Sequence, residues 1–192
     1  MQIGKSVSFR WMIDGTKADC GLLARAGRLY FEAVPERLLD SMREVFVGHQ
    51  VSSLGHLLQT ASWAERDGAG GEVIVAALHD DIGDAFTPDN HSEFAPALLR
   101  PHVREEVHWV IRHHGILQLY YYGRHEGVAP NLRERYRSIA HFDACAAFCA
   151  PWDQTAFDRV DRSEPLDHLA PMLRRISSRR PPHPVSAEGM AI

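Results

Sequence analysis

The segment 73–78 constrains the fold more than any other part of the chain. It reads Val-Ile-Val-Ala-Ala-Leu, and residues 79–84, His-Asp-Asp-Ile-Gly-Asp, follow it at once. A segment this apolar is expected in the interior, where acids and imidazoles are costly unless a partner compensates them. The sequence therefore predicts a compensating group at the end of this segment. We expect it to be a metal ion for which other parts of the chain supply further ligands.

Apolar residues recur at helical spacing along the chain, and no stretch shows a strong strand pattern. Six helices are predicted after residue 48, at about 49–67, 72–83, 90–99, 103–114, 142–153 and 165–176. Asn90 is the expected N-cap of the third, with Glu93 as its capping-box partner. Residues 115–122 read as an apolar and aromatic segment. The fold class predicted from this pattern is all-α, a helical bundle with a metal site in its core.

The length of 192 residues predicts one domain. Within it we expect residues 1–47 to form a lead-in and helices packed on the core, 48–176 to form the core, and 177–192 to form a flexible tail. A net charge of −4 gives no basic surface for nucleic acid, and the longest aliphatic run is too short to cross a membrane. No secretory pattern follows Met1, and three cysteines suggest no disulfide framework, so the cytoplasm is the expected compartment.

Several polar residues lie on the apolar faces of predicted helices. Helical spacing places His91, His114 and Asp153 inward on three separate helices. His56 differs, because periodicity alone assigns it to the solvent side of 49–67, and only a second packed layer there would bury it. A single core histidine is more often hydrogen-bonded to a neighbour than bound to metal.

Taken together, these residues indicate a metal centre. With Asp80 and Asp81 at the end of 72–83, neutral packing would require five separate compensations, whereas one shared centre satisfies them all. Imidazole and carboxylate ligands suit iron, manganese and zinc, and the lack of candidate thiolates argues against a structural cysteine-rich zinc site.

The order of these residues is similar to that in the HD-domain superfamily, whose members are metal-dependent phosphohydrolases or diiron oxygenases. The resemblance covers roughly residues 48–172. The segment 56–59, His-Leu-Leu-Gln, the 24-residue step from His56 to Asp80 (80 − 56), and Trp152-Asp153 look most like the oxygenase branch that contains the hydroxyphosphonate-cleaving enzymes, with myo-inositol oxygenase more distant. A closer likeness, over 54–173, is to bacterial proteins usually called predicted HD phosphohydrolases.

This resemblance implies two metal ions, which we expect to be iron, with manganese or zinc as alternatives. In the family pattern the first metal is held by a histidine, the His-Asp dyad and a late aspartate. The second is held by two further histidines, and the dyad aspartate bridges. Carried over to this chain, the implied ligands are His56, Asp80, Asp81, His91, His114 and Asp153.

The dyad is where this chain departs from the family. Family members read Leu-His-Asp-Ile-Gly, whereas residues 79–83 read His-Asp-Asp-Ile-Gly. Without a gap, Asp80 takes the place of the histidine, His79 takes that of the leucine, and Asp81 is the bridge. Alternatively, a local bulge lets His79 and Asp80 act as the dyad. In a third interpretation the first metal position is weakened or lost.

The resemblance also bears on the substrate. Phosphonate-cleaving relatives have a lysine four residues after the last metal histidine, where this chain has Gln118. They have a tyrosine and a glutamate seven to ten residues before the first histidine, where this chain has Phe46 and His49. A phosphonate substrate is therefore not expected. Gln118, His49 and Tyr121 are the predicted substrate contacts.

Three functions are compatible with these residues. The leading hypothesis is a diiron oxygenase that uses O₂ to cleave a small oxygen-bearing organic substrate. The second is a metal-dependent phosphohydrolase of a small phosphate ester. The third is a binding protein that keeps the HD scaffold without catalysis. No catalytic residue beyond the metal ligands is predicted.

Overall fold

Helices are the regular structure of every described part of the chain. The computed structural model describes residues 16–19, 21–22, 51–87 and 90–179, and none of these lies in a strand. The all-α prediction is therefore confirmed. Most of 1–47, His49 and residues 180–192 lie outside the described residues, so the lead-in and tail stay predictions. No helix in the described ranges is both long and apolar enough to span a membrane.

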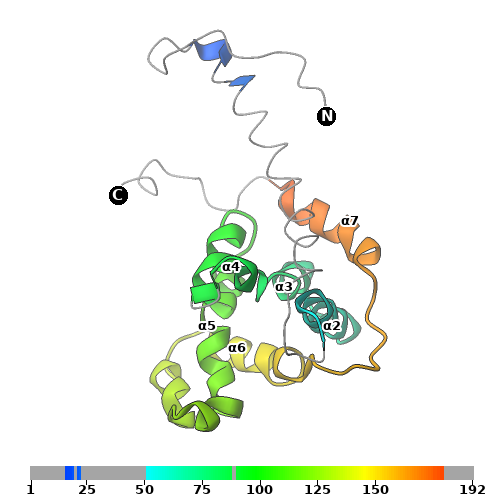
Figure 1. The fold of residues 1–192 in the computed structure, drawn as a ribbon. Coiled ribbons are helices and arrows are strands. Elements are labelled where there is room, and N and C mark those ends of the chain that lie inside the picture. The colour runs from blue at the N-terminus through cyan, green and yellow to red at the C-terminus, as the bar shows by residue number, and fades with distance from the viewer. Residues whose placement is uncertain (1–15, 20, 23–50, 88–89, 180–192) are drawn as a thin grey trace.

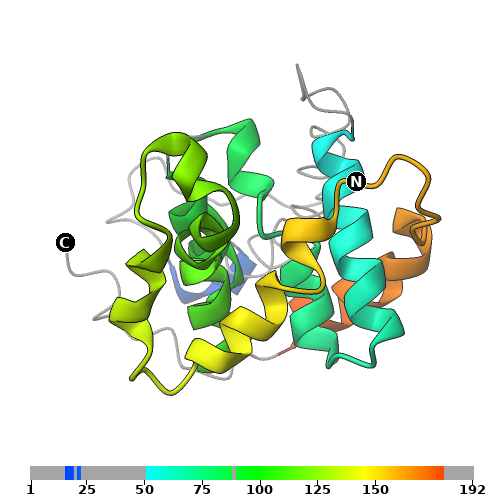
Figure 2. The same ribbon diagram turned by 90° about the horizontal axis from the view of Figure 1, so that it is seen from below.

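α3 packs against α2, α7 and α5 (Figure 1). In Figures 1 and 2, α2, α3 and α7 lie together on one side and α4 and α5 on the other, and α5 also packs against α6. Short 3₁₀ helices, labelled η, connect them. The elements are α2 (Ser53–Arg66), α3 (Gly71–Ala77), η2 (Ile82–Ala85), α4 (His91–Leu99), α5 (Glu105–Tyr122), η4 (Gly123–Glu126), η5 (Pro130–Tyr136), α6 (Phe142–Cys149), η6 (Asp153–Thr155) and α7 (Leu166–Ser177).

Both faces of α2 are covered. The side-chain oxygen of Ser52, the N-cap residue, accepts a hydrogen bond from the Gly55 amide, and the helix begins at Ser53, four residues after the predicted start (53 − 49). The side-chain amide of Gln59 donates a hydrogen bond to the backbone carbonyl of Asp158 at 2.8 Å. The segment 156–164 therefore lies along the face that periodicity assigned to solvent. That segment is the second layer that buries His56, and the solvent-facing assignment from periodicity alone was wrong.

The helix predicted over 72–83 ends earlier than expected. Regular α-helix stops at Ala77, and the His79 amide instead bonds to the Ala76 carbonyl, three residues back. This tighter turn leads into η2 and places the side chains of Asp80 and Asp81 in a turn rather than on a helix. The prediction that 142–153 is one helix was also wrong, because α6 ends at Cys149 and Asp153 opens η6.

The helices α4 and α5 present the remaining polar core residues. Asn90 is the N-cap residue of α4, as expected, but its side chain makes no capping hydrogen bond, and Glu93 instead pairs with Arg112 at 3.2 Å. The predicted capping box is therefore wrong. α5 continues through the aromatic segment to Tyr122, so His114 lies within one long helix and is buried in the core.

Candidate metal centre

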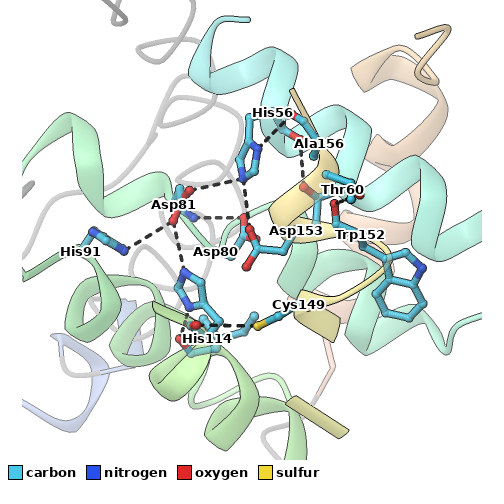
Figure 3. A network of polar contacts seen from close by, with 12 residues as sticks. His56, Thr60, Asp80, Asp81, His91, His114, Cys149, Trp152, Asp153 and Ala156 are labelled. Carbon is cyan, nitrogen blue, oxygen red and sulfur yellow. Dashed lines mark hydrogen bonds and ion pairs between the residues drawn. The ribbon is translucent and has the colours of Figure 1, made fainter. Parts of the chain in front are cut away.

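Two groups of side chains could each hold a metal ion. The outer group is Asp81, His91 and His114, and the inner group is His56, Asp80 and Asp153; within each group, one potential ligand atom per residue lies within 4.8 Å of the others. These are the six ligands that the family resemblance implies. Figure 3 shows them converging from α2, α4, α5, η6 and the turn after α3. The structure therefore brings together residues that are up to 97 positions apart (153 − 56).

The two groups differ in exposure. His56, Asp80 and Asp153 are all buried, and the Asp80 and Asp153 residues are fully enclosed. In the outer group only His114 is buried, whereas the side chains of His91 and Asp81 are 28% and 21% exposed. Asp80 and Asp153 are thus closed to solvent, whereas the outer group can be reached from outside.

Asp81 lies between the two groups. Its Oδ1 is 3.2 Å from Nε2 of His114 and 3.5 Å from Nε2 of His91, while its Oδ2 is 3.3 Å from Nε2 of His56. Each carboxylate oxygen thus faces a different group (Figure 3). This is the arrangement that a carboxylate bridging two metal ions requires.

The three histidines present the same ring nitrogen to the centre. Nδ1 of His56 contacts the Ala156 carbonyl at 3.1 Å, Nδ1 of His114 contacts the Ile111 carbonyl at 2.6 Å, and Nδ1 of His91 contacts the Asp84 carboxylate at 3.0 Å. These oxygens can only accept, so each Nδ1 carries its proton and donates. In a neutral ring Nε2 then has a free lone pair, as in most metal-ligating histidines.

The distances at the centre fit metal coordination better than direct ion pairing. An imidazolium and a carboxylate in a charge-assisted hydrogen bond close to about 2.7–2.9 Å. Two ligand atoms bound to one metal at ordinary bond lengths and angles lie about 3.0–3.4 Å apart. The contacts of Asp81 to His114 and His56, at 3.2 and 3.3 Å, fall in the second range, and the contact to His91, at 3.5 Å, is slightly longer.

Unsatisfied buried atoms gather in the inner group. Nε2 of His56, Oδ2 of Asp80 and both carboxylate oxygens of Asp153 are buried without a hydrogen-bond partner. Buried polar groups are rarely left in this state, because each costs free energy when removed from water. A cation among these four atoms would satisfy them together, so the residues present fit a metal ion.

Without metal, protons would have to balance the carboxylates. Burial disfavours charge on His114, but its hydrogen bond with Asp81 and the charge of Asp153 outweigh this cost and raise its pKa to about 10. Burial likewise opposes charge on His56, yet the carboxylates of Asp153 and Asp81, 3.5 and 3.3 Å from its Nε2, raise its pKa well above the usual value. Burial and the neighbouring charge of Asp81 raise the pKa of Asp80. A metal ion bound at this centre would therefore compete with protons.

A cavity of about 590 Å³ lies beside the outer group. It reaches Asp81, His91 and His114 of the outer group and His56 of the inner group, and its other walls include Ser53, Asp84, Gln118, Tyr121, Tyr122, Gln154 and Phe157. Two of the predicted substrate contacts, Gln118 and Tyr121, thus line the cavity. The third, His49, lies outside the described residues.

His79, the alternative to Asp80, belongs to neither group. It is buried elsewhere, with Nδ1 2.7 Å from the Val75 carbonyl, and it lines a small separate cavity with His102 and Leu173. Burial lowers its pKa to about 4, which keeps the ring neutral. The geometry favours Asp80 over His79 as the inner ligand.

Sequence analysis missed three groups at the centre. Asp84 accepts from His91, the ring of Phe157 stacks on that of His56 with centroids 4.7 Å apart, and the carbonyl of Ala156 orients His56. Asp84 lies in the polar segment 79–84, so its proximity to Asp80 and Asp81 in the sequence was a usable signal. No side-chain pattern reports a backbone carbonyl, and Phe157 lies beyond the predicted helices.

No protein-family model matches this chain, and no curated protein matches it either. The HD-domain assignment therefore stays a prediction from the residues quoted above.

Proposed function

We propose that this chain is an HD-domain metalloenzyme, a diiron oxygenase that uses O₂ to cleave a small oxygen-bearing organic substrate. The outer group carries the proposal. Asp81, His91 and His114 supply one carboxylate and two imidazoles at the wall of the cavity of about 590 Å³. A site with two histidines, one carboxylate and open positions is typical of non-haem iron oxygenases.

The inner group supports a second metal position. It contributes His56, Asp80 and Asp153, and the two oxygens of Asp81 face the two groups separately. Iron ions held there would supply electrons and Lewis acidity for the activation of O₂. The chain itself would hold the imidazoles in one tautomer, balance the metal charge with three carboxylates, and keep water from the buried inner group.

The cavity supports an uncharged substrate more than a phosphate ester. No lysine or arginine is among the described residues that line it, so none of these residues offers a phosphate the charged hydrogen bonds of an ammonium or guanidinium group. Gln118 follows His114 by one helical turn on α5, and its amide can both donate to and accept from a substrate hydroxyl. Tyr121, Tyr122 and Phe157 add aromatic surface for an apolar part of the substrate.

The test is to load the purified chain anaerobically with Fe²⁺, measure iron per chain, and record electron paramagnetic resonance after partial oxidation. We expect two irons per chain and the signal of a coupled mixed-valent pair. His114→Gln should lose this signal. Glu93→Ala should keep it, because Glu93 lies on the same helix as His91 but pairs with Arg112 at the surface.

Other results would select another function. Two bound metals of any kind, with hydrolysis of p-nitrophenyl phosphate and no coupled iron signal, would favour the phosphohydrolase. Metal content at background level in the wild-type chain would exclude both enzymes and leave a binding protein.

A further inference from the structure

The Asp84 carboxylate contacts His91 of the outer group at Nδ1, the ring nitrogen opposite the one that faces Asp81. Asp84 lies in η2 and His91 is the first residue of α4. Oδ1 of Asp84 is 3.0 Å from Nδ1 of His91, and the opposite nitrogen, Nε2, points toward Oδ1 of Asp81 at 3.5 Å. The imidazole of His91 thus lies between two carboxylates, one of which belongs to the proposed ligands.

This contact distinguishes His91 from the other two histidines. Nδ1 of His56 and Nδ1 of His114 each donate to a neutral backbone carbonyl, whereas Nδ1 of His91 donates to a charged side chain. A carboxylate is the stronger acceptor, and it raises the electron density that Nε2 can offer to a metal.

The surroundings explain why His91 requires such a partner. His56 is held by the stacked ring of Phe157, and His114 is enclosed in the middle of α5 with only 1% of its side chain exposed. His91 is the first residue of α4, and its side chain is 28% exposed. Packing therefore restrains its ring less than the rings of His56 and His114, and water competes for its nitrogens. A charged hydrogen bond can supply the orientation that packing supplies for the other two.

We propose that Asp84 is the positioning residue of the outer metal site, fixing His91 in the tautomer that presents Nε2 and strengthening that nitrogen as a ligand. This inference rests on the proposed metal function, and it names a residue outside the predicted ligand set. It also makes the outer site, and not the inner one, depend on Asp84.

Two substitutions separate the charge of Asp84 from its hydrogen bond. Asp84→Asn keeps an oxygen that accepts from Nδ1 but removes the charge, whereas Asp84→Leu removes both. Glu93→Ala is the matched control, since it removes a carboxylate two residues after His91 that pairs with Arg112. All four proteins are titrated with Co²⁺, with metal content and visible absorption measured, because Co²⁺ bands report the ligand geometry of each site without any substrate.

We expect the wild-type chain and Glu93→Ala to bind two Co²⁺ with the same spectrum. Asp84→Leu should weaken the second Co²⁺ by about 10–100-fold and alter its absorption, while the first stays bound. Asp84→Asn should recover part of this affinity. A role in folding alone would change the melting temperature of the metal-free protein and would affect both sites together.

The outcomes are distinguishable. If the wild-type chain binds two Co²⁺ and Asp84→Leu binds both with unchanged affinity and spectrum, Asp84 has no positioning role and the proposed function stands. If Asp84→Leu loses both metals together, the inference is also wrong. If the wild-type chain binds no metal, both the inference and the proposed function fail.

Discussion

Asp80 and Asp81 are adjacent in the chain, but their side chains belong to different ligand groups. Oδ1 of Asp80 accepts a hydrogen bond from the backbone amide of Asp81 at 3.0 Å, and this turn directs Asp80 inward while Asp81 lies between the groups. Asp80 is fully enclosed, whereas the Asp81 side chain is 21% exposed. Two consecutive carboxylates can therefore serve a closed and an accessible metal position at once.

The first prediction concerns this division. Asp80→Ala should lower metal content from two ions per chain to one, because it removes a ligand of the inner group alone. Asp81→Ala should lower it further, because both groups lose a carboxylate oxygen. Metal content is measured after dialysis, with His79→Leu as the control that keeps two ions. A chain that loses an ion with His79→Leu and none with Asp80→Ala would contradict the assignment and support the bulged alignment.

Metal uptake should release protons. In the metal-free protein, burial opposes charge on His114, but Asp81 and Asp153 raise its pKa to about 10, so at pH 7 a proton occupies the nitrogen that a metal would bind. Apparent affinity should then rise about tenfold per pH unit for each proton displaced. Calorimetric titration with Zn²⁺ in two buffers of different ionisation enthalpy counts the protons.

The same pKa has a consequence for stability. Because the pKa of His114 is higher in the folded chain than in the unfolded chain, its contribution to metal-free stability is complete below a pH of about 6.5 and is lost as the pH rises toward 10.

In the calorimetric titration, His114→Gln should release fewer protons on metal binding. His113→Gln, whose ring lies outside both groups, should not change the number of protons released. Metal affinity that does not vary between pH 6 and 9 would disprove this competition.

His79 should make the protein sensitive to acid. Burial lowers the pKa of His79 to about 4, so between pH 6.5 and 4 this histidine is protonated in the unfolded chain but neutral in the folded chain. Stability is therefore lost as the pH falls, by about 2 kcal/mol between pH 7 and pH 5. His79→Leu should remove most of this loss, while the exposed His125→Leu should not. Urea unfolding of the metal-free variants at both pH values gives the difference, and equal losses in all three proteins would refute the prediction.

Gly83 should be required for the position of His91. A Cβ at Gly83 would lie 2.6 Å from Cα of His91 and 2.8 Å from its carbonyl oxygen. These are backbone atoms, which cannot move aside as easily as the end of a flexible side chain. Gly83→Ala should destabilise the protein by about 1–3 kcal/mol and weaken the outer metal. In Gly71→Ala the new Cβ would meet only the ends of Arg175 and Met172 at 3.4 Å, so it is the control. Unchanged melting temperature and metal content in Gly83→Ala would contradict this account.

The sequence was most informative where one apolar face decides the structure. The apolar repeat through Val107, Val110 and His114 placed this histidine in the core, and the structure buries it. It was less informative at the ends of helices. The spacing that put Asp153 on one helix with Phe142 does not show that α6 ends at Cys149, because a tightened turn can preserve burial while changing the backbone.

By itself, the sequence determined the helical class, the apolar faces, and a set of imidazoles and carboxylates that neutral packing would hardly satisfy. Only the tertiary structure decided that His56 is covered, that His79 contacts the Val75 carbonyl, and that Asp84 contacts His91. The reason is physical. Periodicity reports which side chains share a face of a helix, but what covers that face, and which way a turn directs its residues, depends on segments distant in the chain, here 156–164 across α2.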